Sequence, residues 1–254
     1  MSRVKIRAVL FDLDGVLVNS IEAHGRAWAW IMSTLGLEVD PFIAPLTEGL
    51  HSRRIARLAF ESAGYEPGMK LSDDELEEII DRKRAYYREI VGQVAIENDV
   101  VEVIRGLRDR GLKLALVTST SRDNLDHIVT REQQKLFDVI LWAGSVAESK
   151  PRPEPYLTAA ERLGVRPAEA VVIENAPLGI RSARAAGAWC IAVASTMPRE
   201  LLGEAHIVVD SVLELGRPGG WESVLERLAA LGQPGRVEPS EELVAPIPVR
   251  RWKA

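Results

Sequence analysis

The sequence predicts an α/β fold: a Rossmann-like parallel sheet with helices on both faces, into which a helical cap domain is inserted. Two observations lead to this prediction. Short apolar segments of strand length alternate with segments of helical periodicity along most of the chain, and this order is typical of βαβ units. The alternation is interrupted after the first apolar segment, where only helical spacing is found. The six strands are expected at residues 3–11, 112–118, 139–143, 170–173, 189–194 and 207–209.

The interruption divides the chain into a discontinuous core and an insertion. The core is assigned to residues 1–16 and 96–231, and the helical cap to residues 17–95. Four prolines and little periodicity then predict a Pro-rich extended tail over residues 232–254.

Two helices of the predicted core have recognisable ends. Asp99 is a favourable N-cap for a helix over residues 100–110, and Gly111 follows the end of that helix. Pro177 suits the first turn of another helix, which is expected to stop near Gly187.

Two further helices can be placed inside the cap. Ser72 and Glu75 have the spacing of a capping box, which predicts the start of a helix that runs toward Ile90. An earlier helix is predicted from a stripe of side chains that are three and four residues apart. The stripe consists of Ile21, His24, Trp28, Ile31 and Leu35.

The composition excludes several functional classes. The net charge of −5 provides no basic surface of the kind that nucleic-acid binding requires. Asp12 ends the first apolar run too early for a signal peptide, and no segment has the length of a membrane span. Cys190 is the only cysteine, which excludes an internal disulfide and a Cys-based zinc site, and its apolar surroundings predict burial. We expect a cytoplasmic monomer, although the sequence leaves a dimer open.

Two carboxylates follow the first predicted strand, in the sequence Phe11-Asp12-Leu13-Asp14-Gly15. Side chains alternate along extended backbone, so Asp12 and Asp14 are expected to point to the same side. Gly15 then allows a sharp turn away from the sheet. Open α/β sheets bind their ligands at this place, just beyond the carboxyl end of a strand.

Polar residues also follow three later strands. Thr118 ends the second strand, where its hydroxyl and the next backbone amides can donate to an anion, although threonine also favours helix N-caps. Lys150 precedes Pro151, and the rigid backbone there would fix the position of its ammonium group, unless it is an ordinary solvated lysine. Glu174 and Asn175 offer oxygen ligands of the kind that Mg²⁺ prefers, although a polar strand end can also cap the following helix.

These four motifs, in this order, resemble those of the haloacid dehalogenase superfamily of aspartate-dependent phosphotransferases. The resemblance extends over residues 5–215. Within the superfamily the chain is similar to the branch with a helical cap after the first motif, which includes β-phosphoglucomutase and small sugar-phosphate phosphatases. Asn19, Ser20, His24 and Trp28 fall where the mutase subgroup has a polar or acidic pair, a histidine and a tryptophan.

The resemblance implies a catalytic role for four residues. Asp12 would be the nucleophile that attacks phosphorus and becomes a phosphoaspartate. Asp14 would protonate the leaving oxygen and then deprotonate the next acceptor. Thr118 and Lys150 would hold the phosphoryl oxygens.

The resemblance also implies a Mg²⁺ ion as cofactor. Its ligands would be the Asp12 carboxylate, the Asp14 backbone carbonyl and a side chain from Glu174 or Asn175. Asn175 is a departure, because relatives often carry aspartate there. The metal site would then have one negative charge less, or Glu174 would be the direct ligand.

The cap is expected to select the substrate, a small phosphorylated metabolite. Candidate substrate-binding residues are His24, Gly49, Arg53 and Arg54 from the cap and Ser119 from the core. The cap is expected to close over the core about hinges near residues 15–20 and 92–98.

The cap loop around Gly49 departs from the mutase pattern. Glu48 occupies the place of a lysine, and Arg53 lies four residues after Gly49 instead of three. The preferred interpretation is therefore a Mg²⁺-dependent phosphomonoester hydrolase. A phosphosugar mutase of the β-phosphoglucomutase kind and a catalytically silent binding or regulatory protein are the alternatives.

Overall fold

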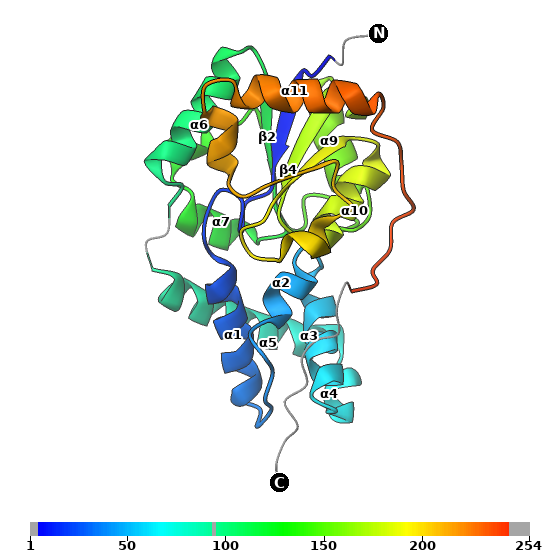
Figure 1. Cartoon of the computed structure of the whole chain (residues 1–254). Coiled ribbons are helices and arrows are strands. Elements are labelled where there is room, and N and C mark those ends of the chain that lie inside the picture. Colours follow the sequence, from blue (N-terminus) through cyan, green and yellow to red (C-terminus); the bar gives the residue numbers. More distant parts are fainter. Residues whose placement is uncertain (1–4, 93–94, 244–254) are drawn as a thin grey trace.

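A six-stranded parallel sheet forms the centre of the protein, which is described here from a computed structural model (Figure 1). The structure describes residues 5–92 and 95–243. The strand order is β3-β2-β1-β4-β5-β6, and every neighbouring pair is parallel. The strands are β1 (Ala8–Phe11), β2 (Lys113–Val117), β3 (Val139–Leu141), β4 (Ala170–Glu174), β5 (Trp189–Val193) and β6 (Ile207–Val209). The α/β fold class and all six strands are confirmed.

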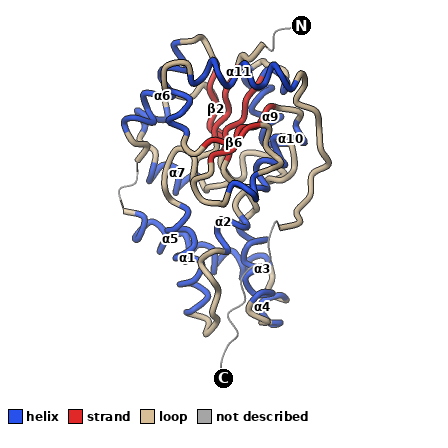
Figure 2. The backbone as a smooth tube through the Cα atoms, viewed as in Figure 1, coloured by secondary structure: helices blue, strands red, loops and turns tan. Residues whose placement is uncertain are grey.

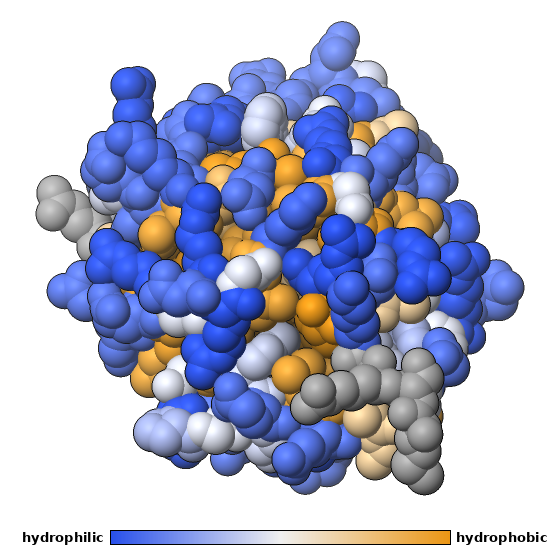
Figure 3. All heavy atoms as spheres, turned by 90° about the horizontal axis from the view of Figure 1, so that it is seen from above, coloured by the Kyte–Doolittle hydropathy of each residue, from blue (hydrophilic) through white to orange (hydrophobic). Residues whose placement is uncertain are grey.

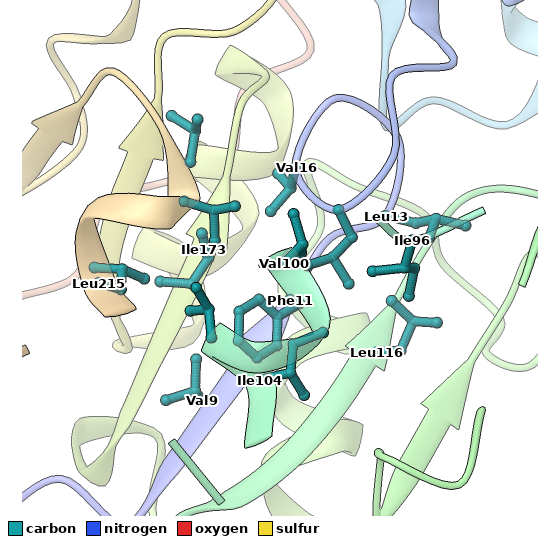
Figure 4. Packing of buried hydrophobic residues seen from close by; sticks show 14 of the residues in the cluster. Val9, Phe11, Leu13, Val16, Ile96, Val100, Ile104, Leu116, Ile173 and Leu215 are labelled. Carbon is teal, nitrogen blue, oxygen red and sulfur yellow. The ribbon is translucent and has the colours of Figure 1, made fainter. Parts of the chain in front are cut away.

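Helices cover both faces of this sheet. Alternate residues of the strands point to opposite faces and therefore enter two separate hydrophobic clusters. Val9 and Phe11 of β1 pack with residues of α6, whereas Ala8 and Leu10 belong to the cluster that contains α9 and α10. The close view in Figure 4 shows the first cluster. The core helices are α6 (Asn98–Asp109), α7 (Arg122–Ile128), α8 (Arg131–Gln134), α9 (Glu154–Leu163), α10 (Pro177–Ala186) and α11 (Gly220–Leu231). Short 3₁₀ helices are η1 (Pro167–Glu169), η2 (Arg199–Leu202) and η3 (Val212–Gly216).

Five helices lie between β1 and α6 and form a helical layer below the core in Figure 1. Figure 2 shows no strand in this layer, and residues 21–92, all of them described, contain only helices and loops. The capping box is confirmed, since the Ser72 hydroxyl accepts from the Glu75 backbone amide and the Glu75 carboxylate accepts in return. The helices are α1 (Ile21–Ser33), α2 (Ile43–Thr47), α3 (Ser52–Ser62), α4 (Glu66–Met69) and α5 (Asp73–Val91).

Some predicted boundaries were wrong. The first strand begins at Ala8, not at residue 3, and residues 1–4 lie outside the described part. Helix α6 has Glu97 as its N-cap, and Asp99 lies in its first turn, where its carboxylate accepts from the Val100 amide. A carboxylate also stabilises the first turn through the helix dipole, so an acidic residue near a helix start does not identify the cap. Leu35 lies beyond the end of α1.

Other predicted elements are confirmed. Helix α10 begins at Pro177 and ends before Gly187, which adopts a left-handed conformation with φ of 76°. Cys190 is free and fully buried. The face seen in Figure 3 is covered mainly by hydrophilic side chains, with hydrophobic atoms visible between them. None of the helices in the described part of the chain is long and apolar enough to cross a membrane.

The tail is described over residues 232–243 and contains neither helix nor strand there. It runs down the side of the molecule from α11 toward the cap (Figure 1). Arg181 donates to the backbone carbonyls of Ser240 and Glu242, and Arg54 of the cap lies 3.7 Å from the Glu241 carboxylate. The remaining predicted tail, residues 244–254, lies outside the described residues.

Candidate active site

The predicted site residues of the core meet where the carboxyl ends of the central strands face the cap. Asp12 and Asp14 follow β1, Thr118 follows β2, Glu174 ends β4, and Lys150 lies on the segment between β3 and α9. All five side chains are buried. Because the strands are parallel, residues far apart in the sequence arrive at the same edge of the sheet.

Gly15 makes the chain turn at this edge, and there are two reasons why only glycine fits there. Its φ of 80° lies in the region that favours glycine. A Cβ atom added to Gly15 would lie 2.2 Å from the Asn175 amide nitrogen. The turn therefore brings the Asp12–Asp14 segment into close contact with the residue that follows β4.

Lys150 joins two carboxylates at the centre of the site. Its Nζ donates to Asp12 Oδ1 at 2.5 Å and to Glu174 Oε1 at 2.7 Å, and it also contacts the Val117 carbonyl at 3.2 Å. The Lys150 side chain is 2% exposed, and those of Asp12 and Glu174 are 5% and 1% exposed. Without the ammonium group, two buried anions would lie side by side.

Burial and charge act in opposite directions on these groups. Burial raises the pKa of the Asp12 carboxyl, the nearby Lys150 ammonium opposes this shift, and the negative charges of Glu174 and Asp14 add to it. Burial alone would lower the pKa of Lys150, but the carboxylates of Asp12 and Glu174 outweigh it and raise that pKa. Lys150 therefore remains a cation in the interior.

Asp14 is surrounded by hydrogen-bond donors. The hydroxyls of Ser20 and Thr120 donate to its two oxygens at 2.5 and 2.6 Å, and that of Thr118 lies at 3.4 Å. Burial would raise the pKa of Asp14, but the hydrogen bonds from His24 and from the hydroxyls of Ser20 and Thr120 lower it overall. Asp14 is thus held as a carboxylate in the ligand-free site.

His24 links Asp14 to a buried lysine of the cap. Its Nε2 lies 3.3 Å from Asp14 Oδ1, its Nδ1 lies 2.8 Å from Lys83 Nζ, and its ring stacks on Tyr87. A neutral imidazole that accepts at Nδ1 and donates from Nε2 satisfies both contacts. Burial lowers the pKa of Lys83 to about 7, although Asp14 opposes the shift.

The lowered pKa of Lys83 makes the stability of the fold depend on pH. Between about pH 7 and the ordinary lysine pKa, the unfolded chain binds a proton that the folded chain does not. The free energy of unfolding of the wild type should therefore rise with pH, by on the order of 1 kcal/mol per unit. Lys83→Met should remove this rise. Urea unfolding of both proteins at pH 7, 8 and 9 measures how the free energy of unfolding depends on pH. The same dependence in both proteins would contradict the lowered pKa of Lys83.

Three buried oxygens in and beside the cleft have no hydrogen-bond partner. They are Asp12 Oδ2, Asn175 Oδ1 and Glu48 Oε1. Asp12 is 3% exposed and Asn175 is fully buried. The amide nitrogen of Asn175 donates to Glu48 Oε2 at 2.8 Å and to Thr196 Oγ1 at 3.0 Å, which leaves its oxygen free to accept. Free buried oxygens fit a bound cation.

Glu174 has no free oxygen of this kind. Its Oε1 accepts from Lys150 and from the Tyr156 hydroxyl at 2.7 Å, and its Oε2 accepts from the backbone amides of Asn175 and Ala176. Among the described residues, no group of three or more His, Cys, Asp or Glu side chains is arranged to hold a metal. An aspartate carboxylate, an amide oxygen and a backbone carbonyl suit Mg²⁺, which keeps waters and takes substrate oxygens to complete its octahedron.

Three of the five predicted substrate-binding residues lie at the cleft. His24, Gly49 and Ser119 line the cleft, and Ser119 donates to the Gly49 carbonyl at 2.9 Å. Gly49 has φ of 99°, and a Cβ there would lie 3.1 Å from Lys150 Cβ, so this glycine allows the cap loop to approach Lys150.

Arg53 and Arg54 do not lie in the cleft, and this part of the prediction is corrected. Arg53 contacts Glu77 and Asp73 at the cap surface, and Arg54 lies near Glu241 of the tail. Helix α3 begins at Ser52, and each residue rotates by about 100° around its axis.

That rotation explains which residues of α3 reach the cleft. Ser52 and Ile55, three positions apart, line it, whereas the two arginines between them point elsewhere. Arg84 of α5 lines the cleft and was missed, as were the hydrogen bonds of Ser20 and Thr120 to Asp14. Helical periodicity places Arg84 on α5 but gives no sign of which face meets the core.

The fold and site define an α/β enzyme with an Asp12–Lys150 centre at the end of its first strand, covered by a helical cap. The sequence profile of the haloacid dehalogenase-like hydrolases matches residues 6–187, and the chain belongs to this family.

Known relatives agree in both sequence and structure. Validoxylamine A 7′-phosphate phosphatase from Streptomyces hygroscopicus subsp. limoneus is 30% identical over 216 residues, which cover 84% of this chain and 97% of that protein. β-Phosphoglucomutase from Bacillus subtilis is 28% identical over 83% of this chain and 92% of its own length. The crystal structure of CbbY from Rhodobacter sphaeroides in complex with phosphate superimposes with a TM-score of 0.69, at 29% identity over 85% of this chain and 99% of that one. The chain is an enzyme whose relatives include phosphatases and a phosphomutase.

Proposed function

We propose that the enzyme is a Mg²⁺-dependent phosphomonoester hydrolase that acts on a small sugar phosphate or a related metabolite through a phosphoaspartate at Asp12. The arrangement of the Asp12 carboxylate carries this proposal. One oxygen is held by Lys150, and the other is buried without a partner. An oriented carboxylate with a free oxygen is suited to nucleophilic attack.

The reaction divides into two displacements at phosphorus. Asp12 Oδ2 forms a bond to phosphorus while the bond to the leaving oxygen breaks, and Asp14 gives that oxygen a proton. Water then attacks phosphorus and transfers a proton to Asp14, and the bond from phosphorus to Asp12 breaks. Phosphate leaves, and both aspartates return to their starting states.

Mg²⁺ would be held by the Asp12 carboxylate, the Asp14 backbone carbonyl and Asn175 Oδ1. The free oxygen of Asn175 and the fully engaged oxygens of Glu174 favour Asn175 as the direct ligand. When bound, the ion would reduce the repulsion between the carboxylate and the phosphoryl group. Lys150, Thr118 and the backbone amides after Thr118 would hold the phosphoryl oxygens.

Asp14 must gain a proton to act as an acid. Its pKa is lowered in the ligand-free site, and an anionic phosphoryl group beside it would raise that pKa. Because an aryl oxide leaves readily and a sugar alkoxide needs a proton, Asp14→Asn should slow phosphorylation by the sugar ester more. Loss of an acid–base group costs about 10²–10⁴ in rate. Single-turnover rates with both esters measure the difference, and equal slowing would refute the acid role.

Hydrolysis is favoured over mutase activity by the charges on the cap. Glu48 lies on the cap side of the cleft, at the place where the mutase has a cation for the second phosphate of a bisphosphate intermediate. Arg53, which would match the arginine for that phosphate, is instead paired with Glu77 and Asp73.

The choice between water and sugar as acceptor can be tested with β-glucose 1-phosphate and catalytic glucose 1,6-bisphosphate. Free phosphate should form from this ester or from another sugar phosphate in a panel, and little of the substrate should be isomerised. Rapid formation of glucose 6-phosphate with little free phosphate would instead establish the mutase. Failure of the whole panel to react would favour a silent binding protein.

A further inference from the structure

Glu48 is an acidic residue that the proposed reaction does not use, yet the backbone places it inside the cleft. It follows the short helix α2 in an extended conformation and precedes Gly49. The Gly49 carbonyl is held by Ser119 of the core, and the Glu48 carboxylate itself accepts from the Asn175 amide. The loop between α2 and α3 is thus attached to the core at two adjacent residues.

The surroundings of Glu48 lack a compensating cation. It lines the same cleft as Asp12 and Asp14. No lysine, arginine or histidine of the described residues forms an ion pair with it, because the nearby Lys150 is engaged by Asp12 and Glu174. Its Oε1 is buried and has no partner. An unpaired buried acceptor costs about 1–3 kcal/mol, and more when it is charged. A cation beside it would remove this cost.

Two other residues in or beside the cleft that Glu48 lines have free oxygens. Asn175 contacts Glu48 directly and has a free Oδ1, and Asp12 has a free Oδ2. Both residues belong to the proposed Mg²⁺ site. An asparagine supplies an oxygen ligand without a negative charge, so a second acidic ligand would raise the affinity of the site for Mg²⁺.

We propose that Glu48 is a ligand of the catalytic Mg²⁺, so that the cap supplies one of the groups that hold the metal of the core. This inference rests on the Mg²⁺ dependence in the proposed function. It assigns to Glu48 the negative charge that Asn175 does not provide. It also couples metal binding to cap closure, since the ion contacts both parts of the enzyme only when the α2–α3 loop lies against the core.

The test measures binding of Mg²⁺ to the intact, substrate-free enzyme by isothermal titration calorimetry. Glu48→Gln should weaken binding by about 10- to 100-fold, the range seen when groups that support a metal site are lost. Glu61→Gln changes an exposed acidic residue of the cap by the same charge and should have no effect. Asn175→Asp in the Glu48→Gln background should restore much of the affinity, because it returns the missing charge to the site.

Cap closure provides a second measurement. Mg²⁺ should slow amide hydrogen exchange in the α2–α3 loop of the wild type but not of Glu48→Gln. Unchanged or tighter Mg²⁺ binding by Glu48→Gln would overturn the inference. If Asp12→Asn still weakened binding in that case, the proposed function would stand without it. A wild-type enzyme that binds no Mg²⁺ and is fully active in EDTA would overturn both.

Discussion

Asp12→Asn should abolish turnover and leave the fold intact. Asparagine has the same shape as aspartate and can still accept from Lys150, but its amide cannot attack phosphorus. Loss of the nucleophile should reduce kcat by on the order of 10⁴-fold or more, as in other enzymes with covalent intermediates. Because the buried environment raises the pKa of Asp12, a neutral side chain there should not destabilise the protein.

The measurement is phosphate release from an aryl phosphate in Mg²⁺ and in EDTA, with unfolding followed in parallel. A matched control is Asp126→Asn, which neutralises an aspartate that pairs with Arg122 on the surface of α7. That variant should keep wild-type activity. Turnover by Asp12→Asn close to the wild-type rate would contradict the covalent mechanism.

Lys150→Met should cause the largest loss of stability, together with loss of activity. The variant leaves the carboxylates of Asp12 and Glu174 buried together without a cation. Breaking a buried ion pair by removing one partner costs about 3–5 kcal/mol. Urea unfolding should show a loss of this size near pH 8.

Acid should reduce this loss. Burial raises the pKa of Asp12, and without Lys150 nothing opposes this shift, so the folded protein gains a proton, and stability, as the pH falls. The loss in free energy of unfolding caused by Lys150→Met should therefore be smaller at pH 5 than at pH 8. It should also be smaller in the double variant Lys150→Met/Glu174→Gln than in Lys150→Met alone. Lys135→Met is the control, because Lys135 pairs with Glu132 at an exposed site and should contribute little. A deficit that did not change with pH would show that the charges are not its cause.

The sequence predicted the core and the place where the candidate catalytic residues meet, because both depend on local patterns. Apolar runs identified the six strands, and a polar residue at the end of each central strand was enough to place Asp12, Asp14, Thr118 and Glu174 together. Lys150 could be added because its order in the chain matched a family pattern. These predictions needed no knowledge of how side chains pack.

The cap could not be predicted to the same depth. Arg53 and Arg54 were expected in the cleft, but whether they reach it depends on the residue at which α3 begins and on how α3 rotates against the core. The choice between Glu174 and Asn175 as metal ligand also depends on contacts that a sequence does not contain. Glu174 is occupied by Tyr156, which lies on α9 and has no sequence relation to the fourth motif.

The stereochemical course at phosphorus tests the central mechanism most directly. A phosphorothioate ester made chiral with two oxygen isotopes is hydrolysed in water that carries the third isotope, and the configuration of the released thiophosphate is determined. Each in-line displacement inverts phosphorus, so attack by Asp12 followed by attack by water predicts net retention. Net inversion would mean that water attacks the substrate directly, and it would contradict a phosphoaspartate at Asp12.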